Sequence, residues 1–198
     1  MKKMVVLLLV FVCMLSFSGC GEKRGTGLPG EKSYYNKDTG ILFELPAGWK
    51  FCGKGNVEEM ASITPKVVQR GFYTSDDVQQ EVILEMMAIN YTTKYDVAIL
   101  MQKTSSDSEK EYMDAVFDRV SDFLYHTNSD GIHGKPVQAT IDGDTWKGYE
   151  VSCNTYVTVY YETYFCKKFG DYFVTILIGT TEENPWEEIV SNFSIVKK

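Results

Sequence analysis

Histidine is scarce in this chain, and the scarcity limits the chemistry that the sequence predicts. His126 and His133 are the two histidines, and their spacing lacks the i, i+4 geometry of a helical zinc site. Asp130 is a conceivable third ligand, but neither the ligand number nor the geometry of a metal site is supported. We therefore expect ordinary loop or helix-end histidines, and His126 suits the negative end of a helix dipole.

Motifs for catalysis and nucleotide binding are also lacking. The chain has no Gly-x-Ser-x-Gly elbow, and the Gly-Thr-Gly of residues 25–27 does not join a strand to a helix as a phosphate loop would. The acidic pairs at 76–77 and 182–183 are typical of turns and helix starts. We predict a protein that is not an enzyme and binds no metal or cofactor. The alternative is an envelope hydrolase that joins His126 or His133 to a cysteine or aspartate.

Positive charge is in deficit. The chain has 20 lysines and arginines against 27 aspartates and glutamates, and its formal net charge is −7. No cluster of basic residues offsets this deficit, which opposes binding to nucleic acid and direct adsorption to anionic lipid. The sequence therefore predicts no nucleic-acid partner.

No hydrophobic run in the chain is as long as a membrane span requires, and the longest run lies at the start. Residues 5–15 are apolar and follow Lys2 and Lys3. Because a membrane span needs about 18 such residues, this run predicts a secretory leader. The leader ends in Ser18-Gly19-Cys20, the pattern of a bacterial lipoprotein signal. We predict a signal peptide over 1–19 and acylation of Cys20, with palmitate among the chains. The alternatives are cleavage elsewhere and a retained transmembrane helix.

A tether and one domain are expected to follow the leader. Residues 20–32 are rich in glycine and charge, so they predict a flexible tether that spans on the order of 20 Å. Residues 33–198 contain no repeat and no long linker, and they predict one domain large enough to bury a core. The predicted location is extracytoplasmic, with the chain anchored to the bacterial cell membrane through Cys20.

The domain is rich in expected strands. A strand ending at Pro46 and a strand over 81–91 that is apolar on both faces come first. Hairpin-forming residues at 142–144, 154–155 and 170–171 separate several later segments. The later strands are expected over 95–101, 137–141, 146–153, 157–169 and 172–178, with a short edge strand over 194–198.

Two helices are expected to cover this sheet. Residues 106–109 match a capping box, and Tyr112, Val116 and Val120 recur at helical spacing after it. Thr181 is expected to cap a second helix over 182–192, and a third, interrupted helix is conceivable over 57–70. A two-sided apolar strand needs two covers, so the fold class predicted is α+β, a three-layer α/β/α sandwich with a mostly antiparallel sheet.

The segment from Gly40 to Trp49 resembles the opening of PsbP-like (Mog/PsbP-type) proteins, in which a strand runs into Pro-x-Gly-Trp. Residues 185–196 are similar to the last helix and strand of that family. The resemblance implies the α/β/α fold and an accessory or interaction role. In this motif Pro46 ends a strand, Gly48 permits a strained turn and Trp49 is a large apolar plug, so all three are structural.

Three cysteines lie beyond the leader and the lipidation site. They are Cys52, Cys153 and Cys166. An odd number leaves at least one thiol unpaired outside the cell. A disulfide between Cys153 and Cys166 needs a longer hairpin loop than the sequence suggests, so buried free thiols are favoured.

Tyrosine is abundant, and five tyrosines crowd one hairpin region. Tyrosine suits recognition surfaces because its ring buries area while its hydroxyl stays wet. They form a candidate patch for a ligand or partner, although core packing explains them as well: Tyr156, Tyr160, Tyr161, Tyr164 and Tyr172.

The leading hypothesis is a membrane-anchored, non-catalytic binding or accessory module, with an envelope protein as the expected partner. Two alternatives stay open. One is the envelope hydrolase described above, and the other is a small-ligand carrier with a tyrosine-lined pocket.

Overall fold

A computed structural model describes residues 28–29, 32–52, 82–103, 108–126, 130–154, 159–181 and 185–197. The predicted signal peptide, Cys20, nearly all of the tether and the conceivable helix over 57–70 therefore lie outside the described residues.

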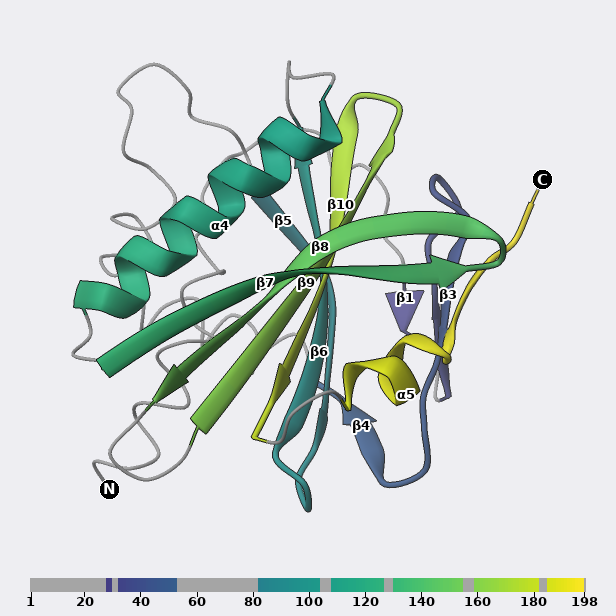
Figure 1. The fold of residues 1–198 in the computed structure, drawn as a ribbon. Coiled ribbons are helices and arrows are strands. Elements are labelled where there is room, and N and C mark those ends of the chain that lie inside the picture. The colour runs from purple at the N-terminus through teal and green to yellow at the C-terminus, as the bar shows by residue number, and fades with distance from the viewer. Residues whose placement is uncertain are drawn as a thin grey trace.

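Seven strands form the main sheet, in the spatial order β4-β5-β6-β10-β9-β8-β7 (Figure 1). Every neighbouring pair is antiparallel. This confirms the antiparallel sheet that the hairpin signals indicate. The strands are β4 (Trp49–Phe51), β5 (Val82–Asn90), β6 (Tyr95–Lys103), β7 (Asp130–Ile141), β8 (Asp144–Asn154), β9 (Val159–Phe169) and β10 (Tyr172–Thr180).

Two of the predicted hairpins are observed at the expected residues. Ile141 pairs with Asp144, and the two residues between them, Asp142 and Gly143, have φ angles of 49° and 81°. Positive φ at both positions is the requirement of a type I′ hairpin, which asparagine, aspartate and glycine meet best. The β9–β10 hairpin also has a two-residue loop, but only its first residue, Gly170, has a positive φ, at 58°, which is the pattern of a type II′ turn. The loop expected at 154–155 falls mostly outside the described residues.

Strand β7 is longer than predicted, because it begins at Asp130 rather than Val137. It contains Pro136, which cannot donate a ladder hydrogen bond. The strand tolerates this proline because β7 is an edge strand of the sheet.

A second, smaller sheet has the order β1-β2-β3-β11. Its strands are β1 (Leu28–Pro29), β2 (Ser33–Tyr35), β3 (Ile41–Glu44) and β11 (Phe193–Ile195). The sequence predicts a short C-terminal edge strand over 194–198; β11 is an edge strand, but it covers 193–195 and belongs to the small sheet. Strand β1 shows that strand pairing already begins within the range assigned to the tether.

The small sheet packs on one face of the main sheet through aromatic side chains. Phe43 is fully buried, and its ring lies 4.6 Å from the Phe193 ring and 6.3 Å from the Phe51 ring, centroid to centroid. Tyr34 is also fully buried in this cluster. The inward side chains of three small-sheet strands thus continue the core of the main sheet.

A β-bulge adds a polar connection between the two sheets. The register of β5 against β6 shifts between Leu84 and Met86. The bulge directs Glu85 toward the small sheet, where one carboxylate oxygen accepts from the Tyr34 hydroxyl at 3.2 Å and from the Asn36 amide at 3.3 Å. Burial, and then the Glu85 charge, raise the pKa of Tyr34, so its phenol remains a proton donor.

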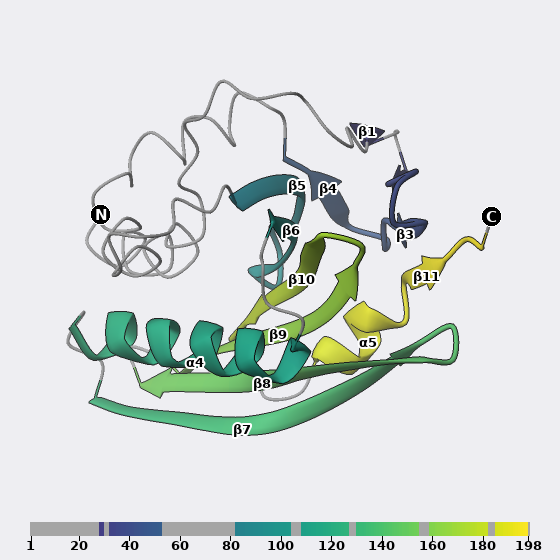
Figure 2. The ribbon, with the colours of Figure 1, turned by 90° about the horizontal axis from the view of Figure 1, so that it is seen from above.

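Helix α4 (Glu109–His126) covers the opposite face of the main sheet (Figure 2). It begins one residue after Ser108, whose hydroxyl accepts from the Glu111 backbone N–H at 3.2 Å. The capping side chain is thus Ser108, and the first helical residue is Glu109. Tyr112, Met113 and Val116 are buried against the sheet.

The three-layer α/β/α sandwich is wrong. One layer is the helix α4, but the other is the small sheet with one short helix, α5 (Trp186–Val190). Both ends of the helix expected over 182–192 differ. It begins at Trp186, with Pro185 as an N-cap that makes no side-chain hydrogen bond, and it ends at Val190, with Ser191 as its C-cap. A strand that is apolar on both faces requires two covers, but its sequence does not specify whether a cover is helical or a sheet.

Pro46, Gly48 and Trp49 form the turn between β3 and β4. Strand β3 ends just before it, and the Trp49 backbone N–H donates to the Pro46 carbonyl at 3.1 Å. Gly48 has a φ of 83°, which side chains with a Cβ rarely adopt. Trp49 is 9% exposed and belongs to the hydrophobic core.

Candidate functional site

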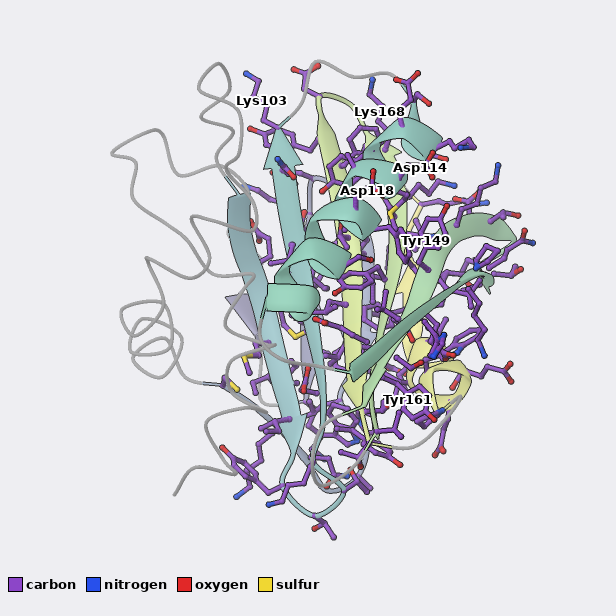
Figure 3. All side chains as sticks on the ribbon, turned by 60° about the vertical axis from the view of Figure 1, so that its left-hand side comes forward. Lys103, Asp114, Asp118, Tyr149, Tyr161 and Lys168 are labelled. Atoms are coloured by element: carbon purple, nitrogen blue, oxygen red, sulfur yellow. The ribbon has the colours of Figure 1, made fainter. Side chains whose placement is uncertain are left out.

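The five tyrosines of the predicted patch do not gather into one surface within the described residues. Tyr164 is 1% exposed, whereas Tyr161 and Tyr172 are half-buried. Tyr161 pairs with Thr180 at one end of the β9–β10 hairpin, and Tyr172 pairs with Phe169 at the other end. Figure 3 shows Tyr161 far along β9 from Lys168, near the other end of the strand. Tyr156 and the side chain of Tyr160 lie outside the described part of the chain.

Two buried carboxylates form the most unusual polar group that the structure describes. Asp96 on β6 and Glu162 on β9 each lie directly opposite Gly179 on the intervening strand β10. Neighbours across strands share a face of the sheet, so both carboxylates point to the α4 side, and Gly179 places no side chain between them. Asp96 is 5% exposed and Glu162 is 1% exposed.

Burial changes the acidity of both groups. It raises the pKa of Asp96 to about 8, and a hydrogen bond from the Gly179 backbone lowers this pKa only in part. Burial also raises the pKa of Glu162 to about 8, against a hydrogen bond from Tyr164 and with a further increase from the Asp96 charge. One oxygen of each carboxyl group, Asp96 Oδ2 and Glu162 Oε1, has no hydrogen-bond partner. The pair is therefore protonated at neutral pH.

Cys52 lies near this pair, at the end of β4, where its backbone N–H donates to the Met87 carbonyl at 2.9 Å. Burial, followed by the Asp96 charge, raises the pKa of its thiol to about 11. Cys166 is a fully buried free thiol on β9, and burial raises its pKa as well. Thiols with raised pKa values are poor nucleophiles. Cys166 is a buried free thiol, as the sequence predicts, whereas Cys52 is a free thiol that is only half-buried. The side chain of Cys153 lies outside the described part.

The predicted histidine constellation is not assembled by the residues that the structure describes. His133 is an exposed residue of β7. His126 is the last residue of α4, and Asp130 begins β7, but the structure does not describe either side chain. Within the described ranges, no group of three or more histidine, cysteine or acidic side chains could hold a metal ion.

A polar cluster lies where α4 crosses β8 (Figure 3). The Tyr149 hydroxyl donates to Asp114 at 2.8 Å, and Lys110 pairs with the other oxygen of the same carboxylate. The hydrogen bond from Lys110, and then the one from Tyr149, lower the pKa of Asp114. The Phe117 ring stacks at 4.7 Å from the Tyr149 ring, which fixes the phenol under the helix. This cluster fastens α4 to the sheet.

Sequence reasoning missed the Asp96 and Glu162 pair. A signal for it existed, because each acid interrupts an otherwise apolar or aromatic strand. The signal was insufficient because only the register of three strands places both acids beside the same glycine.

The outer edge of the main sheet at β7 and the outward face of the small sheet are both exposed to solvent. The outer edge of β7 carries exposed residues over 133–136, but Pro136 and Lys135 are features that protect an edge from further strand pairing. The outward face of the small sheet instead carries the exposed apolar residues Tyr35 and Val196. None of the helices in the described ranges is long and apolar enough to cross a membrane.

Comparison with known proteins gives little further information. No protein-family model and no curated protein sequence matches the chain, so the resemblance to PsbP-like proteins is not confirmed. Among solved structures, the chain is similar to LpqN, a Mycobacterium tuberculosis protein involved in cell envelope biogenesis, with 12% identity and a TM-score of 0.44. The match covers 85% of this chain and 91% of LpqN. This similarity is too low to carry an argument about fold or function.

Proposed function

We propose that the protein is an extracytoplasmic lipoprotein, anchored through acylated Cys20, whose domain binds another envelope component as an accessory module. The lipoprotein signal at residues 16–20 carries this proposal, because it combines a basic start, a short apolar run and small residues before the cysteine. The first described strand begins at Leu28, so few residues separate the anchor from the domain. The protein therefore acts close to a membrane surface.

The binding role is supported by how the described polar side chains are used. The Tyr149–Asp114–Lys110 cluster fastens a helix, and the Tyr34–Asn36–Glu85 network joins two sheets. Both arrangements stabilise a rigid scaffold, and such scaffolds present their surfaces to partners without a large conformational cost.

Two experiments, performed one after the other, test this function. Mass spectrometry of the protein extracted from membranes is expected to find a chain that begins at an acylated Cys20, and the Cys20→Ser variant is expected to leave the membrane fraction. Crosslinking in intact cells before detergent extraction is then expected to recover a specific envelope protein with the native chain. An unmodified mature start contradicts the anchor, and recovery of the chain alone contradicts the accessory role.

Envelope hydrolysis is a second candidate, and one observation favours it. Paired carboxylates with raised pKa values, as at Asp96 and Glu162, are found at general acid–base sites. A panel of ester, amide and glycoside substrates tests it directly. Turnover that disappears in both Asp96→Asn and Glu162→Gln, while each variant remains folded, would establish the hydrolase and remove the accessory role.

A further inference from the structure

The outward face of the small sheet places apolar side chains next to one another. Tyr34 and Phe43 pair across β2 and β3 and point into the core, so the alternate residues point outward. Tyr35 and Leu42 are the next pair in the register, and Tyr35 is 38% exposed. Ser194 of β11 lies opposite Leu42, and Val196, just beyond β11, is 45% exposed with its backbone N–H bonded to the Gly40 carbonyl at 2.9 Å. We call Tyr35, Leu42 and Val196 the outer face.

The anchor attaches beside this face. Leu28 of β1 pairs directly with Tyr35. Residues 21–27 separate Leu28 from Cys20, and this stretch reaches at most about 28 Å when fully extended. A folded domain of about this size measures roughly 40 Å across, which is more than the reach of this stretch. The side of the domain next to Leu28 therefore meets the membrane more often than the far side does.

The surroundings of the outer face are compatible with a membrane surface. The described charged residues around it are Lys32, Lys37 and Lys197 together with Asp38, Glu44 and Asp142, all of them exposed, and Asp142 accepts from the Ile195 backbone N–H of β11. These charges balance locally, whereas the whole chain has a net charge of −7. Tyrosine is favoured at membrane–water interfaces, where its ring meets the acyl region and its hydroxyl meets the headgroups. Figure 2 shows the small sheet on the side of the main sheet away from α4, so α4 would point to the periplasm or exterior.

We propose that the outer face rests on the lipid bilayer that holds the anchor, and that this contact orients the domain with α4 away from the membrane. The inference rests on the proposed lipidation of Cys20. The anchor keeps the face at a high effective concentration near the bilayer, so a weak contact is sufficient to favour one orientation. The occupant of the face is lipid and not a second protein.

The test measures the distance of two labelled sites from lipid in the acylated full-length protein. A fluorophore is attached either at Lys37→Cys, in the exposed turn beside the outer face, or at Asp118→Cys, on the exposed side of α4. Each protein is reconstituted into vesicles of equal parts phosphatidylethanolamine and phosphatidylglycerol that contain a nitroxide-labelled lipid. Native chain treated with the same reagent measures background labelling of Cys52, Cys153 and Cys166. We expect quenching at position 37 and little quenching at position 118.

Matched variants separate the outer face from the tether alone. Tyr35→Ser combined with Val196→Ser is expected to abolish the difference in quenching between the two sites. The control is Tyr91→Ser, which removes a tyrosine that is 56% exposed in the turn after β5 and is expected to leave the difference intact. Circular dichroism of each variant checks that it is folded.

The possible results distinguish this inference from the proposed function. Equal quenching at both sites in a chain that floats with the vesicles overturns the membrane contact, while the anchor remains valid. A quenching difference that survives in the double variant also overturns it, because the tether alone would then orient the domain. A chain that is never acylated and does not float contradicts the proposed function itself.

Discussion

The two faces of the main sheet differ in what they bury. The face under the small sheet buries an aromatic and aliphatic cluster, and its buried carboxylate, Glu150, has a cation 2.7 Å away on Lys135. The α4 face buries Asp96 and Glu162, and the structure describes no salt bridge from a basic side chain to either of them. Burying a carboxyl group without a cation favours its neutral form. The comparison shows that both faces are packed, and that the carboxyl groups buried without a described cation on the α4 face make stability depend on pH.

The largest expected effect on stability comes from removing a buried aromatic ring under the small sheet. Phe43→Ala removes a fully buried ring that contacts Phe51 and Phe193, and we expect the free energy of unfolding to fall by about 3–5 kcal/mol. Urea denaturation monitored by tryptophan fluorescence measures this loss. Tyr91→Ala, at an exposed turn, serves as the control and should change the value little. A loss of less than about 1 kcal/mol for Phe43→Ala would mean that the small sheet does not contribute to the core.

The next effect comes from removing the buried acids of the α4 face. Their pKa values are about 8 in the folded protein but near 4 in the unfolded chain, so the unfolded chain releases these protons first. The free energy of unfolding should therefore fall as pH rises from about 4 to about 8, and stay level above that. Asp96→Asn and Glu162→Gln should each gain about 1–3 kcal/mol at pH 8 over the native chain, and nothing below about pH 4.

Glu150→Gln makes the same chemical change as Asp96→Asn and Glu162→Gln, but on the face under the small sheet. It therefore sharpens the comparison between the two faces. It removes the partner of Lys135, so we expect no gain in stability at pH 8. The measurement is the unfolding midpoint in urea across a series of pH values. Equal gains in all three variants would show that pairing with Lys135 does not distinguish the two faces.

A smaller effect is expected at the start of α4, the element that covers the polar face. Ser108→Ala removes the side chain that accepts from the Glu111 backbone N–H, and should destabilise the protein by about 1 kcal/mol. Ser108→Asp keeps an acceptor at this position and should restore most of the loss. Thermal denaturation followed by circular dichroism compares the two. If both variants match the native chain, then Ser108 does not cap the helix in solution.

The smallest effect concerns the fastening of α4 to β8. Tyr149→Phe removes the hydroxyl that donates to Asp114, so the pKa of Asp114 should rise toward its usual value. Lys110→Gln should raise it further, because the hydrogen bond from Lys110 has the larger influence. NMR titration of the Asp114 carboxyl carbon reports both shifts. A larger shift in Tyr149→Phe than in Lys110→Gln would contradict this order.

Much of the local structure could be read from the sequence. The positive φ angles at Asp142 and Gly143 follow from the Asp-Gly pair, and the turn at Gly48 follows from the Pro-x-Gly-Trp motif. The long helix was placed to within a few residues, since its buried positions recur at helical spacing. The candidate sites were harder, because the tyrosine patch depended on sequence proximity, and alternate residues of a strand point to opposite faces. That alternation buries Tyr164 while Tyr161 stays on the other side of β9.

The sequence by itself determined the leader signal, the antiparallel hairpins and the need for two covers on a strand that is apolar on both sides. These properties depend on neighbouring residues, whose φ angles, hydrogen bonds and hydrophobic periodicity are local. Only the tertiary structure decided that one cover is a second sheet, and that Asp96 and Glu162 meet beside Gly179. Both outcomes depend on strand order and register between distant segments, which no local pattern specifies.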